Sequence, residues 1–288
     1  SDLLVIAPRF DAEGVLRLIE DYKLTAGIMV PIMFIRMLKL PETVRNRYDL
    51  SSLEFIIHAA APCPADVKRK MIEWFGPVIN EFYGSTESSA VVACNSEQAL
   101  AKPGSVGKTV PEAELRILDE QGNCLPPNTV GEIYSRFPLL DFTYHGKPEA
   151  RAEIDRDGFI TSGDMGYLDE DGFLFIADRV KDMVISGGVN IYPAEIESVL
   201  HNYPGIKDCA VFGIPDEEFG ESVMAVVEAE GANDICVDKV KAYLREHLAG
   251  FKVPKTIEIG SDLPREDSGK IFKRRLRDKY WQQAGRKI

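Results

Sequence analysis

The segment Glu81-Phe82-Tyr83-Gly84-Ser85-Thr86-Glu87 combines aromatic rings, hydroxyl groups and carboxylates directly after an apparent strand, Val78–Asn80. A buried strand that runs into a loop of small and hydroxyl residues is how open α/β sheets build ligand sites. Thr86 offers a hydroxyl to a phosphate, and Glu87 offers hard oxygen ligands to Mg²⁺. Tyr83 offers a ring for stacking. On spacing alone, the competing interpretation is a polar loop that ends in a helix cap.

Three other segments carry groups of possible chemical use, each with an ordinary alternative. Asp164 ends the run TSGD and can accept hydrogen bonds from a ribose diol, or it can lie in a common turn. Gly187 and Gly188 let a ligand approach the backbone closely, or they form a tight hairpin. Lys270, in PREDSGK, is a mobile cationic donor or an inert surface lysine.

Alternating strands and helices must position the first segment. The short apolar runs Ala26–Val30, Phe55–Ala59 and Val78–Phe82 predict buried strands. Pro64–Phe75 between them predicts an amphipathic helix with proline at its start. This rhythm indicates a parallel sheet whose ligand edge lies where the strands end.

The sequence pattern changes after about Gly104. Turn pairs such as Asp157-Gly158 separate short alternating strands as far as Leu174, which predicts an antiparallel meander or small barrel. After a charged junction at 177–182 the pattern restarts and predicts a small α+β domain. Its expected helices and strands are Pro193–Asn202, Cys209–Ile214, Ser222–Glu228, Val237–Leu248 and Thr256–Ile259.

Composition excludes several function classes. The 288 residues are 45% hydrophobic and 28% charged, and the net charge of −12 argues against broad nucleic-acid binding. No apolar run is long enough to span a membrane. Five cysteines without a CxxC pair predict neither a disulfide framework nor a zinc site, which fits a cytoplasmic location. The first residues show neither Met nor a signal peptide, so we expect the chain to begin inside a longer protein.

In this order the segments resemble the core motifs of the adenylate-forming superfamily of acyl-CoA synthetases, peptide-synthetase adenylation domains and luciferases. YGSTE, TSGD, DRVKDMVISGGVNIYPAEIE and PREDSGK all match, and the resemblance covers essentially the whole chain. It implies an α/β and α+β fold. Residues 1–180 would be the C-terminal portion of the large AMP-binding domain, with a parallel sheet and a small β-barrel. Residues 181–288 would be the small mobile α+β domain.

The resemblance also implies a two-step reaction. A carboxylic acid attacks the α-phosphate of ATP, which gives acyl-AMP and pyrophosphate, and the thiol of CoA then converts acyl-AMP to the thioester. The runs HAAAPCP at 58–64 and EWFGP at 73–77 look most like bacterial acyl-CoA synthetases for fatty or related acids. The implied partners are therefore the acid, ATP, Mg²⁺ and CoA, without nucleic acid. Oligomeric state cannot be read from the sequence.

The resemblance assigns roles residue by residue. Thr86, Glu87 and Lys270 would be catalytic: Thr86 contacts phosphate, Glu87 holds Mg²⁺, and Lys270 bridges the carboxylate and α-phosphate oxygens. Tyr83 would stack on adenine, and Asp164 would bind the ribose. The residues that it places at the nucleotide are Ala60, Ala61, Pro62, Tyr83, Gly84, Thr86, Asp164, Arg179 and Lys270.

Three further roles follow from the resemblance. Lys181 would be the hinge about which the small domain rotates between the two steps. Rotation would withdraw Lys270 and bring the CoA-channel residues Ser186, Gly187 and Gly188 toward the pantetheine. The acyl pocket would include His58, Gly84 and Ser85, although His58 fits a structural histidine equally well.

Two departures from the family pattern limit these expectations. The glycine- and hydroxyl-rich phosphate loop expected upstream is absent from the 288 residues, so we expect a fragment that cannot complete adenylation alone. Glu266 and Asp267 place negative charge beside Lys270. The alternatives are an adenylation domain that loads a carrier protein, a non-catalytic adenylate-binding module and, with no oxygenation signature to support it, an oxidative luciferase.

Overall fold

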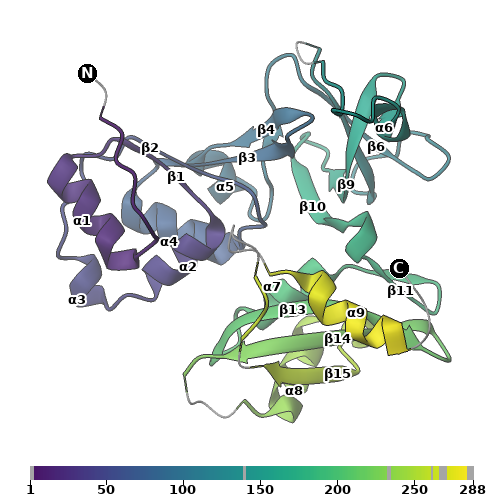
Figure 1. Cartoon of the computed structure of the whole chain (residues 1–288). Coiled ribbons are helices and arrows are strands. Elements are labelled where there is room, and N and C mark those ends of the chain that lie inside the picture. Colours follow the sequence, from purple (N-terminus) through teal and green to yellow (C-terminus); the bar gives the residue numbers. More distant parts are fainter. Residues whose placement is uncertain (1–2, 139–140, 232–234, 261, 266–270, 284–288) are drawn as a thin grey trace. The chain divides into compact units, whose positions relative to one another are not determined.

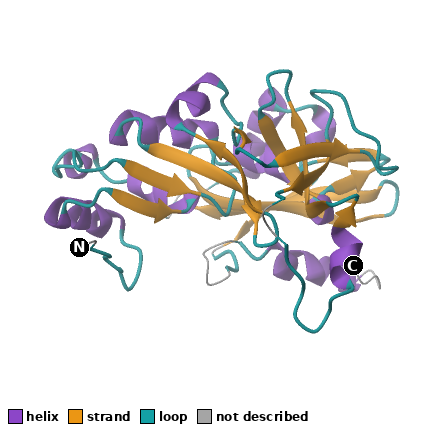
Figure 2. Ribbon diagram, turned by 90° about the horizontal axis from the view of Figure 1, so that it is seen from above, coloured by secondary structure: helices purple, strands orange, loops and turns teal. Residues whose placement is uncertain are grey.

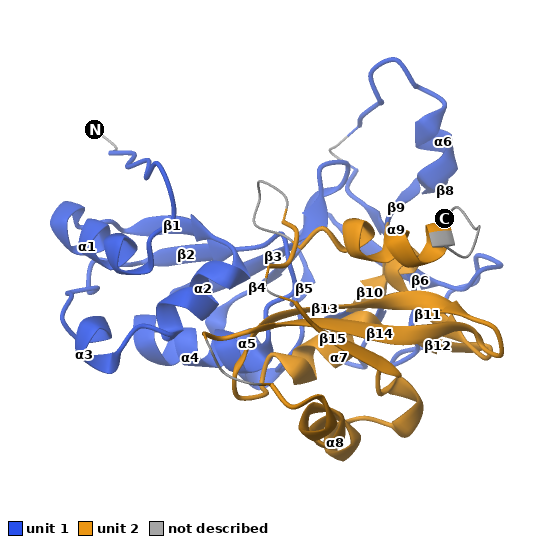
Figure 3. Ribbon diagram, turned by 60° about the horizontal axis from the view of Figure 1, so that its bottom comes forward, with its two compact units in different colours: residues 1–162, 166–176 blue, residues 163–165, 177–288 orange. Residues whose placement is uncertain are grey.

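The computed structural model describes residues 3–138, 141–231, 235–260, 262–265 and 271–283. The chain divides into two compact units, shown in different colours in Figure 3. Unit 1 comprises residues 1–162 and 166–176, and unit 2 comprises residues 163–165 and 177–288. The domain boundary at 180/181 stays a prediction. No helix within the described ranges is both long and apolar enough to cross a bilayer.

Unit 1 contains the predicted parallel sheet. Its strands β1 to β3 run parallel, and β4 and β5 continue the sheet in antiparallel fashion. The first four strands are labelled in Figure 1, and the five strands span Ala26–Met29 (β1), Phe55–His58 (β2), Ile79–Ser85 (β3), Ser89–Cys94 (β4) and Lys108–Thr109 (β5). The third strand is longer than expected because β4 pairs with its second half. The predicted α/β class is confirmed.

Helices cover one face of this sheet. Ile56 and Ile79 pack against Leu16, Phe34 and Met71, all buried. Burial of side chains of this size contributes about 1.5–3 kcal/mol each. The helices are Ala12–Tyr22 (α1), Pro31–Leu38 (α2), Glu42–Arg45 (α3), Ala65–Phe75 (α4) and Ser96–Ala101 (α5). They position the carboxyl ends of β2 and β3, where the predicted nucleotide residues lie.

A second sheet follows the first along the chain. Its strand order is β10-β9-β7-β6, with β8 paired to β9, which is the order of an open meander. Ile117, Ile133 and Leu174 fill its core together with Val91 and Val92 of β4. Its elements are Glu114–Leu118 (β6), Gly131–Arg136 (β7), Ala150–Ile154 (α6), Asp155–Arg156 (β8), Phe159–Leu168 (β9) and Leu174–Arg179 (β10).

Unit 2 is the expected α+β fold. The long hairpin of β13 and β14 forms its centre, β11 and β15 pair with β14, and β12 pairs with β11. Figure 2 shows the strands in orange and the helices in purple. The elements are Val180–Asp182 (η1), Val184–Ser186 (β11), Val189–Ile191 (β12), Pro193–Leu200 (α7), Ile206–Asp216 (β13), Gly220–Ala229 (β14), Val237–His247 (α8), Gly250–Lys252 (η2), Thr256–Gly260 (β15) and Lys273–Gln283 (α9).

The sheet of unit 2 has apolar clusters on both faces. Alternation along β13 directs Val211 toward Ile196, Leu200 and Leu244 of α7 and α8. The neighbouring Phe212 packs with Leu263 and with Leu276 and Tyr280 of α9. Side chains alternate across a strand, so one hairpin can hold helices on both sides.

Candidate functional site

The segment YGSTE forms the end of a β-hairpin. Tyr83, Gly84 and Ser85 are the last residues of β3, Thr86 and Glu87 lie in the turn, and β4 follows. The helix-cap interpretation is therefore wrong. A Cβ atom on Gly84 would collide with the carbonyl oxygen of Ser89, so only glycine fits this position. The hairpin presents Thr86 at an exposed position.

Reciprocal hydrogen bonds close this turn. The amide of Ser85 donates to Oγ of Ser88 over 2.9 Å, and the amide of Ser88 donates to Oγ of Ser85 over 3.1 Å. Ser88 is 6% exposed, and the sequence argument did not single it out. These bonds fix the backbone on both sides of Glu87. The acyl-pocket role of Ser85 stays a prediction.

Tyr83 of YGSTE and Ser162 of TSGD meet within unit 1. The hydroxyls of Tyr83 and Ser162 are 3.1 Å apart and hydrogen-bonded. The Tyr83 ring also packs against the core around Val91 and Val92. An aromatic ring held both by the core and at its hydroxyl has a restricted orientation, as a stacking partner for a base requires.

The run Ala60-Ala61-Pro62 follows β2 at the carboxyl edge of the parallel sheet. Ala60 has φ +76°, in the left-handed region that non-glycine residues seldom occupy. Such strain is found mainly at functional sites, where the surrounding structure maintains it. Its position and strain agree with the predicted backbone role beside adenine, which stays a prediction.

His58 lies on the helix-covered face of β2. It is fully buried, and its ring meets Phe34 edge-on with 5.2 Å between centroids. Burial, with a contribution from the nearby Lys68 ammonium, lowers the pKa of His58 to about 3, so the ring is neutral at physiological pH. Neither ring nitrogen has a hydrogen-bond partner among the described residues. This burial favours a structural role, and the acyl-pocket role stays a prediction.

Asp164 and Arg179 come together within unit 2. Nε of Arg179 lies 3.4 Å from Oδ1 of Asp164. Asp164 lies within β9 rather than in a turn, and Gly163 before it has φ +74°. Both residues are among those that the resemblance places at the nucleotide, a role that stays a prediction. A carboxyl group that contacts one Arg nitrogen retains acceptor positions for a ribose diol.

Lys181, the predicted hinge, accepts a hydrogen bond within unit 2. Lys181 lies in the 3₁₀ turn η1, and its carbonyl oxygen accepts from Nη1 of Arg277 in α9 over 2.9 Å. The buried Asp178 accepts from the amide of Ala194 at the start of α7. Burial raises the pKa of Asp178, and the charge of Lys273 counteracts part of that rise. Lys181 as the pivot stays a prediction.

Gly187 and Gly188 form the turn of the β11–β12 hairpin, as the hairpin interpretation expects. Both have positive φ, +57° and +79°. The amide of Gly187 donates to the carbonyl of Phe219 over 2.8 Å, and a Cβ atom on Gly187 would lie 2.9 Å from the Phe219 ring. The turn therefore requires glycine at both positions. A CoA-channel role for it, with Ser186, stays a prediction.

Comparison with known families agrees with these motifs. The model of the AMP-binding enzyme family matches residues 3–144, and the model of the AMP-binding enzyme C-terminal domain matches residues 195–270. The two matches occur in the order that the motifs imply. The chain belongs to the AMP-binding enzyme family.

The curated relatives of this chain include a CoA ligase and a CoA synthase. It is 38% identical to a long-chain-fatty-acid–CoA ligase of Bacillus subtilis over 95% of its own length and 49% of the relative's. It is also 38% identical to a feruloyl-CoA synthase of Amycolatopsis, over 96% and 56%. The chain therefore spans about half the length of the curated relatives it matches.

Solved structures agree with this assignment. The chain superposes on an amide bond synthetase from Marinactinospora thermotolerans with a TM-score of 0.87 and 30% identity, covering 95% of this chain and 56% of that one. It superposes on the Bacillus subtilis o-succinylbenzoate CoA synthetase in complex with an acyl-adenylate intermediate with a TM-score of 0.82 and 31% identity, covering 93% and 54%.

Glu87 is held by a residue that the sequence argument missed. The hydroxyl of Tyr144 donates to Oε1 of Glu87 over 2.8 Å. This bond lowers the pKa of Glu87, so the carboxylate is ionised at neutral pH. Tyr144 lies more than 50 positions along the chain, in a segment without a periodic pattern, so no local signal indicated the contact.

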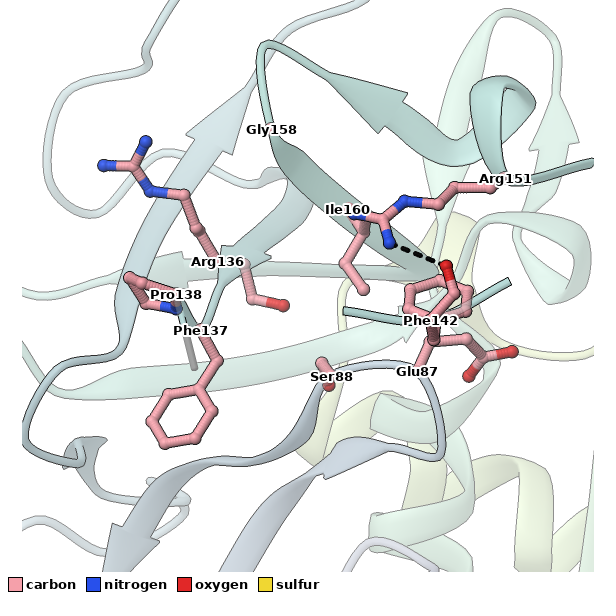
Figure 4. A pocket seen from close by; sticks show the side chains of 10 residues that line it. Glu87, Ser88, Arg136, Phe137, Pro138, Phe142, Arg151, Gly158 and Ile160 are labelled. Carbon is pink, nitrogen blue, oxygen red and sulfur yellow. Dashed lines mark hydrogen bonds between the residues drawn. The ribbon is translucent and has the colours of Figure 1, made fainter. Parts of the chain in front are cut away.

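Glu87 also lines a pocket of about 140 Å³ on unit 1, shown in Figure 4. No group of three or more His, Cys, Asp or Glu residues that could hold a metal occurs among the described residues. Mg²⁺ commonly uses one or two carboxylates together with water and substrate phosphates. The single ionised carboxylate of Glu87 fits that mode of binding. The pocket is lined by Glu87, Ser88, Ser135, Arg136, Phe137, Pro138, Phe142, Arg151, Gly158 and Ile160.

Lys270, Glu266 and Asp267 lie outside the residues that the structure describes. The residues that flank them are described, and Arg265 and Ile271 form an antiparallel bridge. The Arg265 guanidinium lies 2.6 Å from Oδ2 of Asp208, whose other oxygen accepts from His201. Burial raises the pKa of Asp208, but these two partners outweigh it and lower the pKa to about 2.

Proposed function

We propose that this chain is part of an ATP-dependent acyl-CoA synthetase. The reaction joins a carboxylic acid to CoA through an acyl-adenylate, with AMP and pyrophosphate as the other products. The observation that carries the proposal is the pair of family matches in order on one chain. Relatives named as acyl-CoA ligases support the same reaction class.

In the adenylation step the residues of unit 1 would act on the nucleotide. Tyr83 would stack on adenine, and Thr86 would donate its hydroxyl to a phosphate. Glu87 would hold Mg²⁺, which when bound supplies charge neutralisation at the phosphates. In unit 2, Asp164 would accept from the ribose hydroxyls. Lys270 would stabilise the negative charge that develops between the carboxylate and the α-phosphate.

In the thioester step the glycine turn would admit CoA. Gly187 and Gly188 carry no side chains, so the backbone could line a narrow pantetheine channel. Lys181 would be the pivot of a rotation of the small domain. That rotation would withdraw Lys270 from the site and bring this glycine turn toward the pantetheine. The fixed contact of Arg277 with the Lys181 carbonyl supports a hinge whose C-terminal side moves with unit 2.

The substrate class we propose is fatty or related acids. A second acceptor is favoured by one comparison: a fatty acid–[acyl-carrier-protein] ligase of Streptomyces coeruleorubidus is 35% identical over 99% of this chain and 55% of its own length. CoA and a carrier protein both present a pantetheine thiol. Direct comparison of the two acceptors therefore separates the two functions.

The test starts from the acyl-adenylate, so it isolates the second step. The chain is mixed with synthetic octanoyl-AMP, and CoA or a phosphopantetheinylated carrier protein is added. We expect thioester and AMP to form faster with CoA than with the carrier. Gly187→Val should abolish the gain in rate, because its side chain meets the Phe219 ring. Gly250→Val is the matched control, since open space surrounds Gly250. No gain over the uncatalysed rate by the folded chain would contradict the proposal.

A further inference from the structure

A loop between β7 and α6 reaches the Glu87 carboxylate. The phenol hydroxyl of Tyr144 in this loop donates to Oε1 of Glu87 over 2.8 Å. Glu87 lies at the hairpin turn, where a long side chain has several rotamers of similar energy. A hydrogen bond to one carboxylate oxygen restrains the rotamer and the orientation of the group. The lone pairs of the second oxygen then point in a defined direction.

Neighbouring side chains hold the Tyr144 ring in place. Its ring meets Phe142 edge-on, with 5.5 Å between centroids and an angle of 85°. The Arg151 guanidinium lies 4.5 Å from the centroid of the Phe142 ring. Arg151 also donates to the Phe142 carbonyl over 2.8 Å, the bond drawn in Figure 4, and to Oδ1 of Asp141 over 2.5 Å. Arg151 thus contacts Phe142, Phe142 contacts Tyr144, and Tyr144 contacts Glu87.

We propose that Tyr144 is a positioning residue that orients Glu87 toward the divalent cation of a bound metal–nucleotide complex. The inference rests on the proposed function, since it takes Glu87 as the metal ligand. Groups that hydrogen-bond to ligating carboxylates orient them, and their loss typically weakens metal binding by about 10- to 100-fold. Arg151 acts one step further away, through its hold on Phe142.

A purely structural role would tie the β7–α6 loop to the hairpin without any effect on the metal. The two roles differ in one measurable respect. An orienting hydroxyl affects affinity for the cation and leaves affinity for the metal-free nucleotide unchanged. Loss of a structural tie would disturb the hairpin, and with it the nucleotide contacts of Thr86 and Tyr83, whether or not metal is present.

The experiment uses Mn²⁺ as a paramagnetic probe and α,β-methylene-ATP as the nucleotide, with the 288-residue chain. Free Mn²⁺ is measured by electron paramagnetic resonance, and nucleotide affinity in EDTA by calorimetry. Tyr144→Phe should raise the Mn²⁺ Kd about 10-fold, with the metal-free nucleotide Kd within about twofold of wild type. Tyr134→Phe is the matched control, since the Tyr134 hydroxyl also donates to a carboxylate, that of Glu132. The control should match wild type in both assays.

A double-mutant cycle gives a second readout. In the Glu87→Gln background, Tyr144→Phe should change the Mn²⁺ Kd by less than about twofold, because the oriented carboxylate is already gone. A Tyr144→Phe variant that binds Mn²⁺ as wild type does would overturn the inference, and so would an equal loss of metal-free nucleotide binding. Absence of any Mn²⁺-dependent binding by the wild-type chain would instead contradict the proposed function.

Discussion

Replacing Lys68 by methionine is expected to destabilise unit 1 strongly. Lys68 of α4 is 4% exposed, and its ammonium contacts the carboxylate of Glu81, which is 5% exposed. The ammonium also donates to the carbonyl oxygen of Ser105 over 3.3 Å. The pair ties α4, which follows Ala60–Pro62, to the strand that carries Tyr83. Methionine keeps the length of the side chain and removes the charge.

The size of the effect follows from the charge that would remain. Removing one partner of a buried ion pair leaves an uncompensated buried charge and costs about 3–5 kcal/mol. Arg69→Met, at the next position of α4, is the matched control. Arg69 is about half exposed and pairs with Asp66 and Glu73 at the surface. Such surface pairs contribute at most about 1 kcal/mol.

The loss of stability in Lys68→Met should depend on pH in a defined direction. Burial raises the pKa of Glu81, and Lys68 opposes that rise. In Lys68→Met the folded-state pKa of Glu81 should therefore lie further above its unfolded value. A carboxyl with a raised folded pKa stabilises the fold at low pH, and that stability is lost as pH rises through the folded pKa. The deficit of the variant should thus shrink from pH 7.5 to pH 5.

Urea unfolding followed by tryptophan fluorescence measures the free energy of unfolding of each variant at each pH. The chain has two tryptophans, and Trp74 lies on α4, close to Lys68. A Trp281→Phe background, used for every variant, makes Trp74 the sole reporter and so follows unit 1. A Lys68→Met deficit below about 1 kcal/mol, a deficit equal to that of Arg69→Met, or one that does not change with pH would refute the reasoning.

Three other substitutions test separate parts of the site. Lys270→Ala in the intact enzyme should slow adenylation about 10²- to 10³-fold and spare thioester formation from supplied acyl-AMP. Equal losses in the two half-reactions would remove Lys270 from its assigned role. Gly84→Ala should destabilise unit 1 by about 3 kcal/mol, measured by urea unfolding, because its Cβ would collide with the Ser89 carbonyl; unchanged stability would show that the hairpin relaxes freely. Ala60→Gly should stabilise unit 1 by up to about 1 kcal/mol, since φ is +76° there, and a lower unfolding midpoint would contradict the strain argument.

Periodicity in the sequence predicted the main elements of the fold. The apolar runs at 26–30 and 55–59 form the parallel strands β1 and β2, and the proline-started pattern at 64–75 forms α4. Each of these segments buries one face against a common core, so its own pattern carries the information. The β4 strand was missed because Thr86 and Glu87 look like loop residues, and the turn is fixed by the Ser85–Ser88 bonds rather than by a Gly-rich signature.

The site was predicted only in part for a related reason. Tyr83, Glu87, Asp164 and the glycine pair lie on local motifs, and the structure brings Tyr83 to Ser162 and Asp164 to Arg179. Side chains that act over long sequence separations left no local trace. Tyr144 reaches Glu87 from 57 positions away, and Arg277 reaches Lys181 from 96 positions away. Such contacts depend on tertiary packing, which a single sequence does not display.

Calorimetric titration of the chain with a non-hydrolysable acyl-sulfamoyl adenosine tests the central claim most directly. The account predicts saturable binding that Asp164→Ala weakens strongly, because the ribose hydroxyls would lose their carboxylate acceptor. Asp157→Ala, at an exposed turn position, is the control and should bind as wild type does. Binding of the analogue with equal affinity by wild type and Asp164→Ala would contradict the assignment of Asp164, and no binding by the folded chain would contradict a preformed nucleotide site in these 288 residues.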